Sequence, residues 1–272
     1  MRHLFLIGAL AALVTGNAAG ADQIDPAALV SLPPADVVIL GEVHDNPAHH
    51  ANQATAVAAL GPAALVFEML TPDQAARVTP DLRADAKGLA EAFEWEASGW
   101  PDFAMYYPIF AAAPEAAILG AALPRDAVRR AVTDGAAAVF GPDAADYGLA
   151  DPLPDDQQAQ REAGQMAAHC NALPETLLGG MVEAQRLRDA ALARAVVQAL
   201  DDTGGPVAVI TGNGHARIDW GLAHALTRAA PDVTLLSLGQ LESVPEGAPP
   251  YDLWLVTDPA PREDPCAGFA VD

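Results

Sequence analysis

One stretch decides the fold, and over residues 37–50 it reads VVILGEVHDNPAHH. Its first four residues are apolar and mostly β-branched, which is typical of a buried strand. Gly41 ends this run and lets the backbone turn. Asn46 suits the N-cap of a helix and Pro47 suits its first position. The stretch therefore predicts a strand that leads directly into a helix.

Polar side chains gather where this strand ends. Glu42 and His44 are two residues apart, so in extended geometry they point to the same side. His49 and His50 fall in the first turn of the helix that follows. Because ligands of open α/β sheets bind beyond the carboxyl ends of the strands, this junction is a candidate site.

Further apolar runs alternate with helical patterns along the chain. The expected strands lie at residues 64–70, 116–121, 207–210, 233–238 and 252–257. Helices are expected at about 47–60, 124–140, 155–170, 175–200 and 216–230, and residues 84–110 are expected to form helices broken at Ser98-Gly99-Trp100-Pro101. This alternation predicts an α/β fold with a mostly parallel β-sheet covered by helices. We expect a single domain over residues 22–272, with a helical insertion at about 71–114.

Composition excludes several classes of partner. The 272 residues are 51% hydrophobic and 18% charged, which suits a globular chain with a sizeable core. The net charge of -22 argues against a nucleic-acid surface, because phosphate binding needs a basic face. No stretch after the N-terminus is long and uncharged enough to cross a membrane, so we expect no stable transmembrane anchor.

Residues 1–21 resemble a secretory signal. Arg2 is the positive start, residues 4–14 are the apolar core, and residues 19–21 are a small-residue cleavage pattern. The alternative is a buried first helix of the fold. We expect an exported protein, periplasmic or extracellular, that is soluble after the signal is removed.

The two cysteines, Cys170 and Cys266, form an even pair. In an oxidising compartment such a pair favours a disulfide, and the alternative is two free buried thiols. Neither lies near the expected cleavage site, so N-terminal lipidation is not expected.

Four chemically active side chains follow three of the expected strands: Glu42, His44, Glu68 and His215. In a parallel sheet these strand ends share one rim, so the side chains are expected to converge. Two histidines and a carboxylate would satisfy a catalytic zinc-type site. Without a metal, a Glu–His pair can serve as general base and acid. The alternative is that each residue satisfies a local turn or cap.

Aromatic residues make up only 6% of the chain but concentrate in one segment, at Phe93, Trp95, Trp100, Phe103, Tyr106, Tyr107 and Phe110. They form either a hydrophobic cluster that packs helices or a wall over a flat ligand. Arg188, on the longest expected helix, is either a surface residue paired with an acid or a positive charge directed into a site.

Several of these motifs resemble one family. Residues 41–46, GEVHDN, with His49, His50 and Gln53, are similar to the opening motif of the ChaN-like haem-binding uptake proteins, within the Tiki and erythromycin-esterase superfamily. Similar later motifs are Phe67-Glu68-Met69, Ser98-Gly99-Trp100-Pro101-Asp102-Phe103 followed by Tyr106 and Pro108, Gln185-Arg186-Leu187-Arg188-Asp189-Ala190, and Gly212-Asn213-Gly214-His215-Ala216-Arg217. The resemblance covers nearly the whole chain after the expected signal.

The resemblance implies an α/β sheet, haem as cofactor and a possible homodimer that encloses it. It also implies a tyrosine as iron ligand, at Tyr106 with Tyr107 second, and a phenolate suits ferric haem. Candidates for binding the haem propionates are His49, His50, Arg188 and Arg217.

Two functions follow from these residues. The leading prediction is an exported haem-binding protein in haem or iron uptake or handling. The alternative is a hydrolase that uses Glu42, His44, Glu68 and His215, with or without a divalent metal, because related branches of the superfamily hydrolyse esters or peptides. A third class is an interaction protein whose polar rim is only structural.

Overall fold

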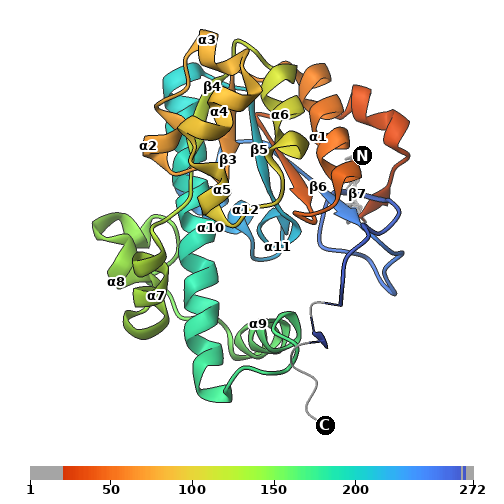
Figure 1. Cartoon of the computed structure of the whole chain (residues 1–272). Coiled ribbons are helices and arrows are strands. Elements are labelled where there is room, and N and C mark those ends of the chain that lie inside the picture. Colours follow the sequence, from red (N-terminus) through yellow and green to blue (C-terminus); the bar gives the residue numbers. More distant parts are fainter. Residues whose placement is uncertain (1–20, 265, 268–272) are drawn as a thin grey trace, which may run out of the picture.

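The computed structural model describes residues 21–264 and 266–267. A seven-stranded, all-parallel sheet in the order β1-β7-β6-β2-β5-β3-β4 forms its centre (Figure 1). The strands are β1 (Asp22–Gln23), β2 (Val37–Glu42), β3 (Ala64–Phe67), β4 (Ala117–Gly120), β5 (Val207–Gly212), β6 (Leu235–Leu241) and β7 (Leu253–Val256). The predicted α/β class and all six expected strands are confirmed, and β1 is an addition.

Helices occupy most of the connections between strands. They are α1 (Pro47–Leu60), α2 (Pro72–Ala75), α3 (Pro80–Arg83), α4 (Ala86–Ala92), α5 (Trp95–Ser98), α6 (Phe103–Ala112), α7 (Arg125–Asp134), α8 (Ala136–Phe140), α9 (Asp155–Ala168), α10 (Glu175–Thr203), α11 (Asn213–Ala216) and α12 (Leu222–Ala229), with the 3-10 turns η1 (Pro26–Ser31) and η2 (Pro142–Ala145).

Two expected helices were wrong in their bounds. The helix expected at 124–140 is divided into α7 and α8 at Gly135, whose φ of 85° a helix does not allow. The helix expected at 216–230 is the short α11 followed, after a turn, by α12. The expected secretory signal at residues 1–21 lies outside the described residues, apart from Ala21. Within residues 21–264 and 266–267, we find no helix with the length and apolar character needed to cross a bilayer.

The sheet is buried on both faces, which explains its continuous apolar strands. Val37 and Ile39 of β2 pack into one cluster with α10 and α12, while Val38 and Leu40 pack into the other with α1 and α6. Alternate residues of a strand point to opposite faces, so one apolar run serves both clusters. The result is a three-layer arrangement with the sheet in the middle (Figure 1).

The aromatic segment belongs to the core. The rings of Phe67 and Phe110 stack with centroids 4.3 Å apart, and Tyr106 and Phe93 are fully buried beside them. Trp100 is different, because it is only half-buried and lies 4.8 Å from the ring of His44. The aromatic segment therefore packs helices α4–α6 against the sheet. Of its seven aromatic residues, Trp100 alone lines the two cavities at the end of the sheet that are described in the next subsection.

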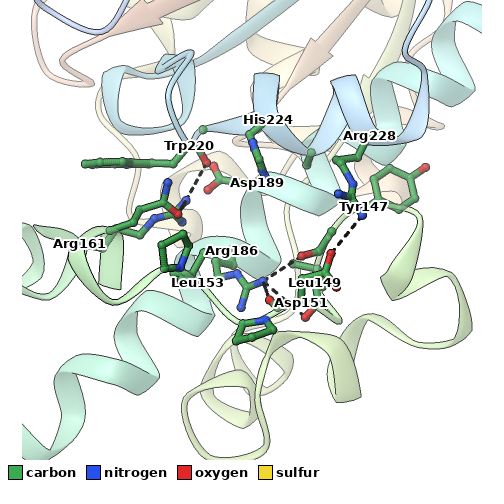
Figure 2. Close-up of a pocket in the computed structure, with 16 residues that line it drawn as sticks. Tyr147, Leu149, Asp151, Leu153, Arg161, Arg186, Asp189, Trp220, His224 and Arg228 are labelled. Atoms are coloured by element: carbon green, nitrogen blue, oxygen red, sulfur yellow. Dashed lines mark hydrogen bonds and ion pairs between the residues drawn. The ribbon is translucent and has the colours of Figure 1, made fainter. Parts of the chain in front are cut away.

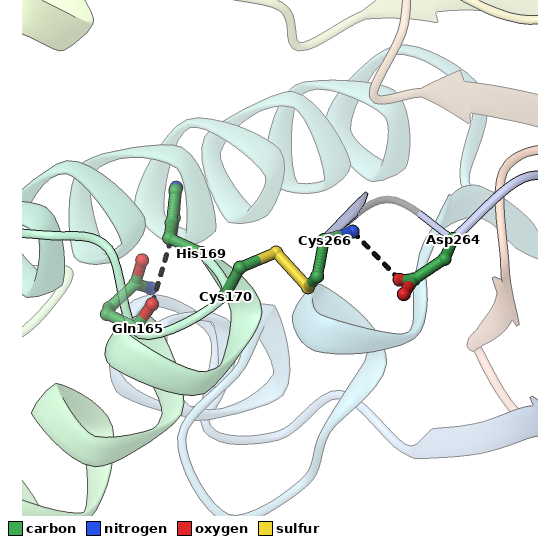
Figure 3. Close-up of a disulfide and its surroundings, with 5 residues drawn as sticks. All are labelled: Gln165, His169, Cys170, Asp264 and Cys266. Carbon is green, nitrogen blue, oxygen red and sulfur yellow. Dashed lines mark hydrogen bonds between the residues drawn. A yellow bond between two sulfur atoms is a disulfide. The ribbon is translucent and has the colours of Figure 1, made fainter. Parts of the chain in front are cut away.

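A disulfide between Cys170 and Cys266 confirms the predicted pairing, with Cα atoms 5.3 Å apart (Figure 3). It fastens the C-terminal segment to the residues that follow α9, below the sheet in Figure 1. Arg262 ties the same C-terminal segment to the turn between β2 and α1, which we call the first junction. Its guanidinium bonds to Asp45 at 2.7 Å and to Glu242.

Candidate functional site

Three neighbouring strands, β2, β5 and β3, end at the same rim of the sheet. Glu42 is the last residue of β2 and lies in register with Gly212, the last residue of β5. Glu68 follows β3 directly, and His215 lies in α11 just after β5. This topology brings Glu42, His44, Glu68 and His215 together, as the parallel sheet predicted.

Glu42 is the buried centre of the first junction, with 1% of its surface exposed. Its Oε1 accepts a hydrogen bond from the Tyr106 hydroxyl at 2.9 Å and lies 2.7 Å from His44 Nδ1. Burial opposes a charge on His44, but the hydrogen bond to Glu42 and the charges of Glu68 and Glu42 outweigh it and raise the pKa of His44. His44 therefore favours the protonated form next to two carboxylates.

Glu68 joins the two junctions. Its Oε2 accepts hydrogen bonds from Thr211 Oγ1 at 2.7 Å and from the Gly212 backbone N–H at 2.8 Å. The same oxygen lies 4.0 Å from His44 Nε2, and Oε1 lies 3.5 Å from His215 Nε2. Burial disfavours the carboxylate, yet the neighbouring histidines and these hydrogen bonds lower the pKa of Glu68 to about 2. Glu68 is therefore a fixed negative charge between two imidazoles.

His215 is held from the opposite side by helix α10. Its Nδ1 lies 2.6 Å from Asp189 Oδ1 and 3.1 Å from Gln185 Nε2. Burial opposes protonation, but Glu68 and Asp189 raise the pKa of His215. Sequence reasoning missed Asp189 as a partner. The available signal was its spacing of four residues from Gln185, which places both on one face of a helix.

Two glycines let the junctions interlock. A Cβ on Gly212 would lie 2.7 Å from His44 Nε2, and a Cβ on Gly41 would lie 2.5 Å from Asn213 Oδ1. Each glycine thus makes room for a side chain of the other junction. The rim is one packed unit, and only glycine at these positions allows this close approach.

Two adjoining cavities open on this rim. The first, of about 530 Å³, is lined by Glu42, His44, Glu68, Trp100, Gln185, Arg188 and His215 together with backbone of both junctions. The second, of about 490 Å³, has walls from Met69, Ala121, Leu123, Arg125 and Leu192. Glu68, Trp100 and Arg188 line both, so the cavities meet there. Each volume lies in the range of small-molecule sites, with an acidic and imidazole wall on one side and an apolar wall on the other.

The structure places most of the residues that the family resemblance suggested as haem contacts away from these cavities. Tyr106 is fully buried, and burial together with the charge of Glu42 raises the pKa of its hydroxyl. Tyr107 is half-buried and lines neither cavity. Arg217 pairs with Asp219 at 2.6 Å and covers the ring of Trp220 at 3.8 Å.

The two histidines at the start of α1 are structural in this arrangement. His49 Nδ1 accepts from the Val43 backbone N–H at 2.8 Å, and His50 Nε2 lies 2.8 Å from the His44 carbonyl. Both are fully buried, and burial lowers the pKa of His49 to about 4. They hold the backbone of the junction and do not reach the cavities.

Arg188 of α10 lies where the two cavities meet. It is exposed, lines both cavities, and makes no hydrogen bond or ion pair with the part of the chain that the structure describes. The rim shows no arrangement of ligands for a divalent metal in the described residues. Within the described ranges, no group of three or more His, Cys, Asp or Glu side chains is arranged to hold a metal ion.

Comparisons with known proteins identify the fold and the family. The solved structure described as cofacial heme binding to ChaN of Campylobacter jejuni aligns with a TM-score of 0.62 and 19% identity, covering 84% of this chain and 89% of that one. The type III effector HopBA1 aligns with a TM-score of 0.46 and 12% identity, covering 82% and 88%, which is too distant to support an argument. No curated protein matches the chain. The family model described as haem-binding uptake, Tiki superfamily, ChaN matches residues 28–226, and the chain belongs to this family.

Proposed function

We propose that this protein is exported and binds haem for the uptake or handling of haem or iron. The family supports haem, and the structural neighbour is described as a haem-binding protein. The observation that carries the proposal is the pair of adjoining cavities, which offers apolar and aromatic walls beside the exposed Arg188, whose charge has no partner among the described residues. Haem needs both features, because its ring is flat and apolar and its two propionates are anionic.

The cavity walls suit these two halves of the ligand. Trp100, Leu123 and Pro124 line the second cavity without being fully buried, and they form an apolar surface for a porphyrin face. Arg188 and Arg125 flank the same cavity and would bind the propionates, since guanidinium groups bind carboxylates in a bidentate manner. When bound, haem would supply iron-centred ligand or redox chemistry, and these residues would bind and orient it.

Two side chains compete for the iron. Tyr106 is the ligand that the family resemblance implies, but its hydroxyl would first have to leave Glu42 and reach the cavity. His44 already lines the cavity, its side chain is 34% exposed, and its Nε2 has no hydrogen bond to the described residues. We therefore include His44 as the ligand that needs the smaller rearrangement, and imidazole is a common axial ligand of haem. The Nε2 of His44 would bind iron only after losing its proton, so this ligation should weaken as the pH falls.

Hemin titration of the purified protein tests both points. We expect a saturable Soret change in the wild type. A tyrosinate spectrum that Tyr106→Phe removes would assign Tyr106, whereas an imidazole spectrum that His44→Ala removes would assign His44. Tyr107→Phe is the matched control, because it removes a neighbouring hydroxyl that lines neither cavity. A wild-type protein with no saturable hemin spectrum, as monomer or dimer, would disprove the proposal.

The propionate contact is tested by Arg188→Ala. Loss of one charge-assisted contact should weaken hemin binding by about tenfold or more. Arg130→Ala, on the exposed surface of α7, is the control and should leave the affinity unchanged. Sedimentation with and without hemin would show whether a homodimer forms around the ligand.

Export is supported by the disulfide, since such bonds persist in oxidising compartments. The N-terminal sequence pattern points the same way. Intact-mass measurement of the protein recovered from the producing cell should give a chain without about its first 21 residues. A mature chain that begins at Met1 would contradict the export proposal and leave haem binding open.

A second function, hydrolysis, is favoured by one observation. Asp189 orients His215, and His215 Nε2 faces Glu68 at 3.5 Å on the wall of an open cavity. A carboxylate-oriented imidazole of this kind can act as general base or acid without a metal. Glu42 and His44 form a second such pair 2.7 Å apart.

This alternative predicts saturable turnover of a 4-nitrophenyl ester. His215→Ala or Glu68→Gln should then lower turnover by about 100-fold or more, because a general base is lost. Tyr107→Phe should leave the rate unchanged. Turnover that survives His215→Ala would exclude the rim as its source.

A further inference from the structure

A separate cavity of about 220 Å³ lies against another face of α10, between α9, α12 and the loop that follows η2 (Figure 2). It shares no residue with the two cavities of the rim. Three arginines line it, Arg161, Arg186 and Arg228, although the chain as a whole carries a net charge of -22. A cluster of cations in so acidic a protein suggests an anionic ligand.

Two of these arginines already have acceptors. Arg186 bonds to Glu183 at 2.7 Å and to the Gly148 and Asp151 carbonyls at 3.0 and 2.8 Å. Arg228 pairs with the Asp151 carboxylate at 3.1 Å. The charges of Arg186 and Arg228 are therefore already met by acceptors of the protein, and these two arginines need no ligand.

Arg161 is the exception. It is 6% exposed, and its Nη2 makes only long contacts, 3.2 Å to Gln157 and 3.5 Å to the Trp220 carbonyl. Its Nε and Nη1 are buried without a hydrogen-bond partner among residues 21–264 and 266–267. A buried charge of this kind is costly unless an acceptor meets it. A side chain of the cavity wall, whose guanidinium also lies 5.2 Å from the centre of the Trp220 ring, thus carries two strong donors that the described part of the chain does not use.

Asp189 presents the complementary group. Its Oδ1 lies against His215, while Oδ2 is buried and receives no hydrogen bond from the described residues. Figure 2 shows Asp189, Arg161 and Trp220 at one side of the cavity, with Arg228 and Tyr147 at the other. Unused donors and an unused acceptor thus line the same small space.

The geometry points to a binding site for a small carboxylate that carries a neighbouring hydroxyl group, such as a short 2-hydroxy acid. Its carboxylate would accept hydrogen bonds from Arg161, and its hydroxyl would donate to Asp189 Oδ2. Leu149, Leu153 and the Trp220 ring would contact the short aliphatic part. This site needs no haem, so its failure and that of the proposed function are independent.

Lactate is the probe that tests it, with propionate as the matched ligand that lacks only the hydroxyl. In an NMR titration of the whole protein, lactate should shift the Trp220 indole and His215 imidazole signals saturably and leave His49 unchanged. Propionate should bind about tenfold more weakly or worse, because it leaves Asp189 Oδ2 unpaired. Arg161→Met should weaken lactate binding by about tenfold or more, whereas Arg130→Met on the exposed face of α7 should not.

Three results would overturn the assignment: no saturable shift with lactate, equal affinity for lactate and propionate, or lactate binding that survives Arg161→Met. If Arg161→Met does not fold, Ala225→Leu takes its place. Ala225 is 4% exposed and lines the cavity, so a larger side chain there should exclude lactate. Undiminished binding in that variant would also overturn the assignment.

Discussion

The two strand-to-helix junctions of the rim look alike in sequence but are built differently. Each has an apolar strand, a glycine and then a histidine. At the first junction, His44 is held by Glu42, two residues away on the same strand, and its side chain is 34% exposed. At the second, His215 is held by Asp189 of α10, and its side chain is 6% exposed.

This difference separates two roles. His215 is fixed between two carboxylates, Asp189 at 2.6 Å and Glu68 at 3.5 Å, so its position depends on the packing of α10 against the sheet. His44 lines the cavity, with its Nε2 4.0 Å from Glu68 Oε2, and its Nδ1 is held by Glu42 at the end of β2. Both junctions line the same cavity, but His44 can move within it whereas His215 is held rigidly.

The largest expected effect comes from removing the support of His215. Asp189→Ala would leave the buried imidazole of His215 facing Glu68 without its closest partner. We expect the free energy of unfolding to fall by about 3–5 kcal/mol, as for other broken buried pairs. Urea denaturation measures it, and Asp202→Ala, on the exposed end of α10, should change it by less than about 0.5 kcal/mol. If Asp189→Ala lowers the free energy of unfolding by less than about 1 kcal/mol, His215 is held no more firmly than His44 and the proposed difference between the junctions is wrong.

Acid should reveal the charge that both junctions share. The pKa of Glu68 is lowered from 4.5 to about 2, so the stability that Glu68 contributes is complete above about pH 4.5 and is lost as the pH falls toward 2. The pKa of His49 is lowered to about 4, which adds a loss as the pH falls from 6.5 toward 4. Urea denaturation at a series of pH values measures the free energy of unfolding as a function of pH. Glu68→Gln should reduce the fall in this free energy between about pH 4.5 and 2, whereas Glu246→Gln on the surface should leave the fall unchanged.

The two site histidines act in the opposite direction. Because the pKa values of His44 and His215 are raised above 6.5, their contribution is complete below pH 6.5 and is lost as the pH rises through the raised values. NMR titration should place both midpoints above 6.5, with His49 near 4. A His215 midpoint below 6.5 would contradict the arrangement of two flanking carboxylates.

The interlocking glycines should give intermediate effects that differ between the junctions. A Cβ at Gly41 would lie 3.0 Å from the Leu238 carbonyl as well as 2.5 Å from Asn213 Oδ1, and backbone cannot move aside easily. Gly41→Ala should therefore cost about 1–3 kcal/mol of unfolding free energy. A Cβ at Gly212 meets the far end of the His44 ring, which can swing into the cavity, so Gly212→Ala should cost less. Equal losses would mean that His44 is as fixed as His215.

The smallest effect is expected for His44→Gln. The His44–Glu42 pair has one partly exposed partner, and such pairs contribute about 0–1 kcal/mol. Thermal or urea unfolding should show a change within that range. A loss of several kcal/mol would place His44 among the structural residues and remove it as a ligand for haem.

Local sequence signals predicted much of the fold and part of the site. Asn46 and Pro47 fixed the start of α1, because a side-chain cap and a locked φ act within a few residues. The meeting of Glu42, Glu68 and His215 followed from the shared rim of parallel strands. By contrast, β1 has only two residues and no periodic signal, so it was not expected.

Long-range packing decided what the sequence did not show. Nothing near Tyr106 indicates that its hydroxyl bonds to Glu42, 64 residues earlier. His49 and His50 looked available at the start of a helix, but the turn of the backbone directs both inward. Asp189 acquires its role only because α10 crosses the end of β5. Such contacts depend on how elements dock, which residue spacing along the chain does not encode.

The strand order also has a consequence for biosynthesis. The central strand β2 pairs with β5 and β6, and Val37 lies in register with Val207 and Leu235. The hydrogen bonds of β2 to its neighbours can therefore form only after residues about 170 to 200 positions later have been synthesised. Long sequence separation of this kind slows folding, because the closure of a long loop precedes any gain from contacts. The middle of the sheet therefore closes only after nearly the whole chain has been made.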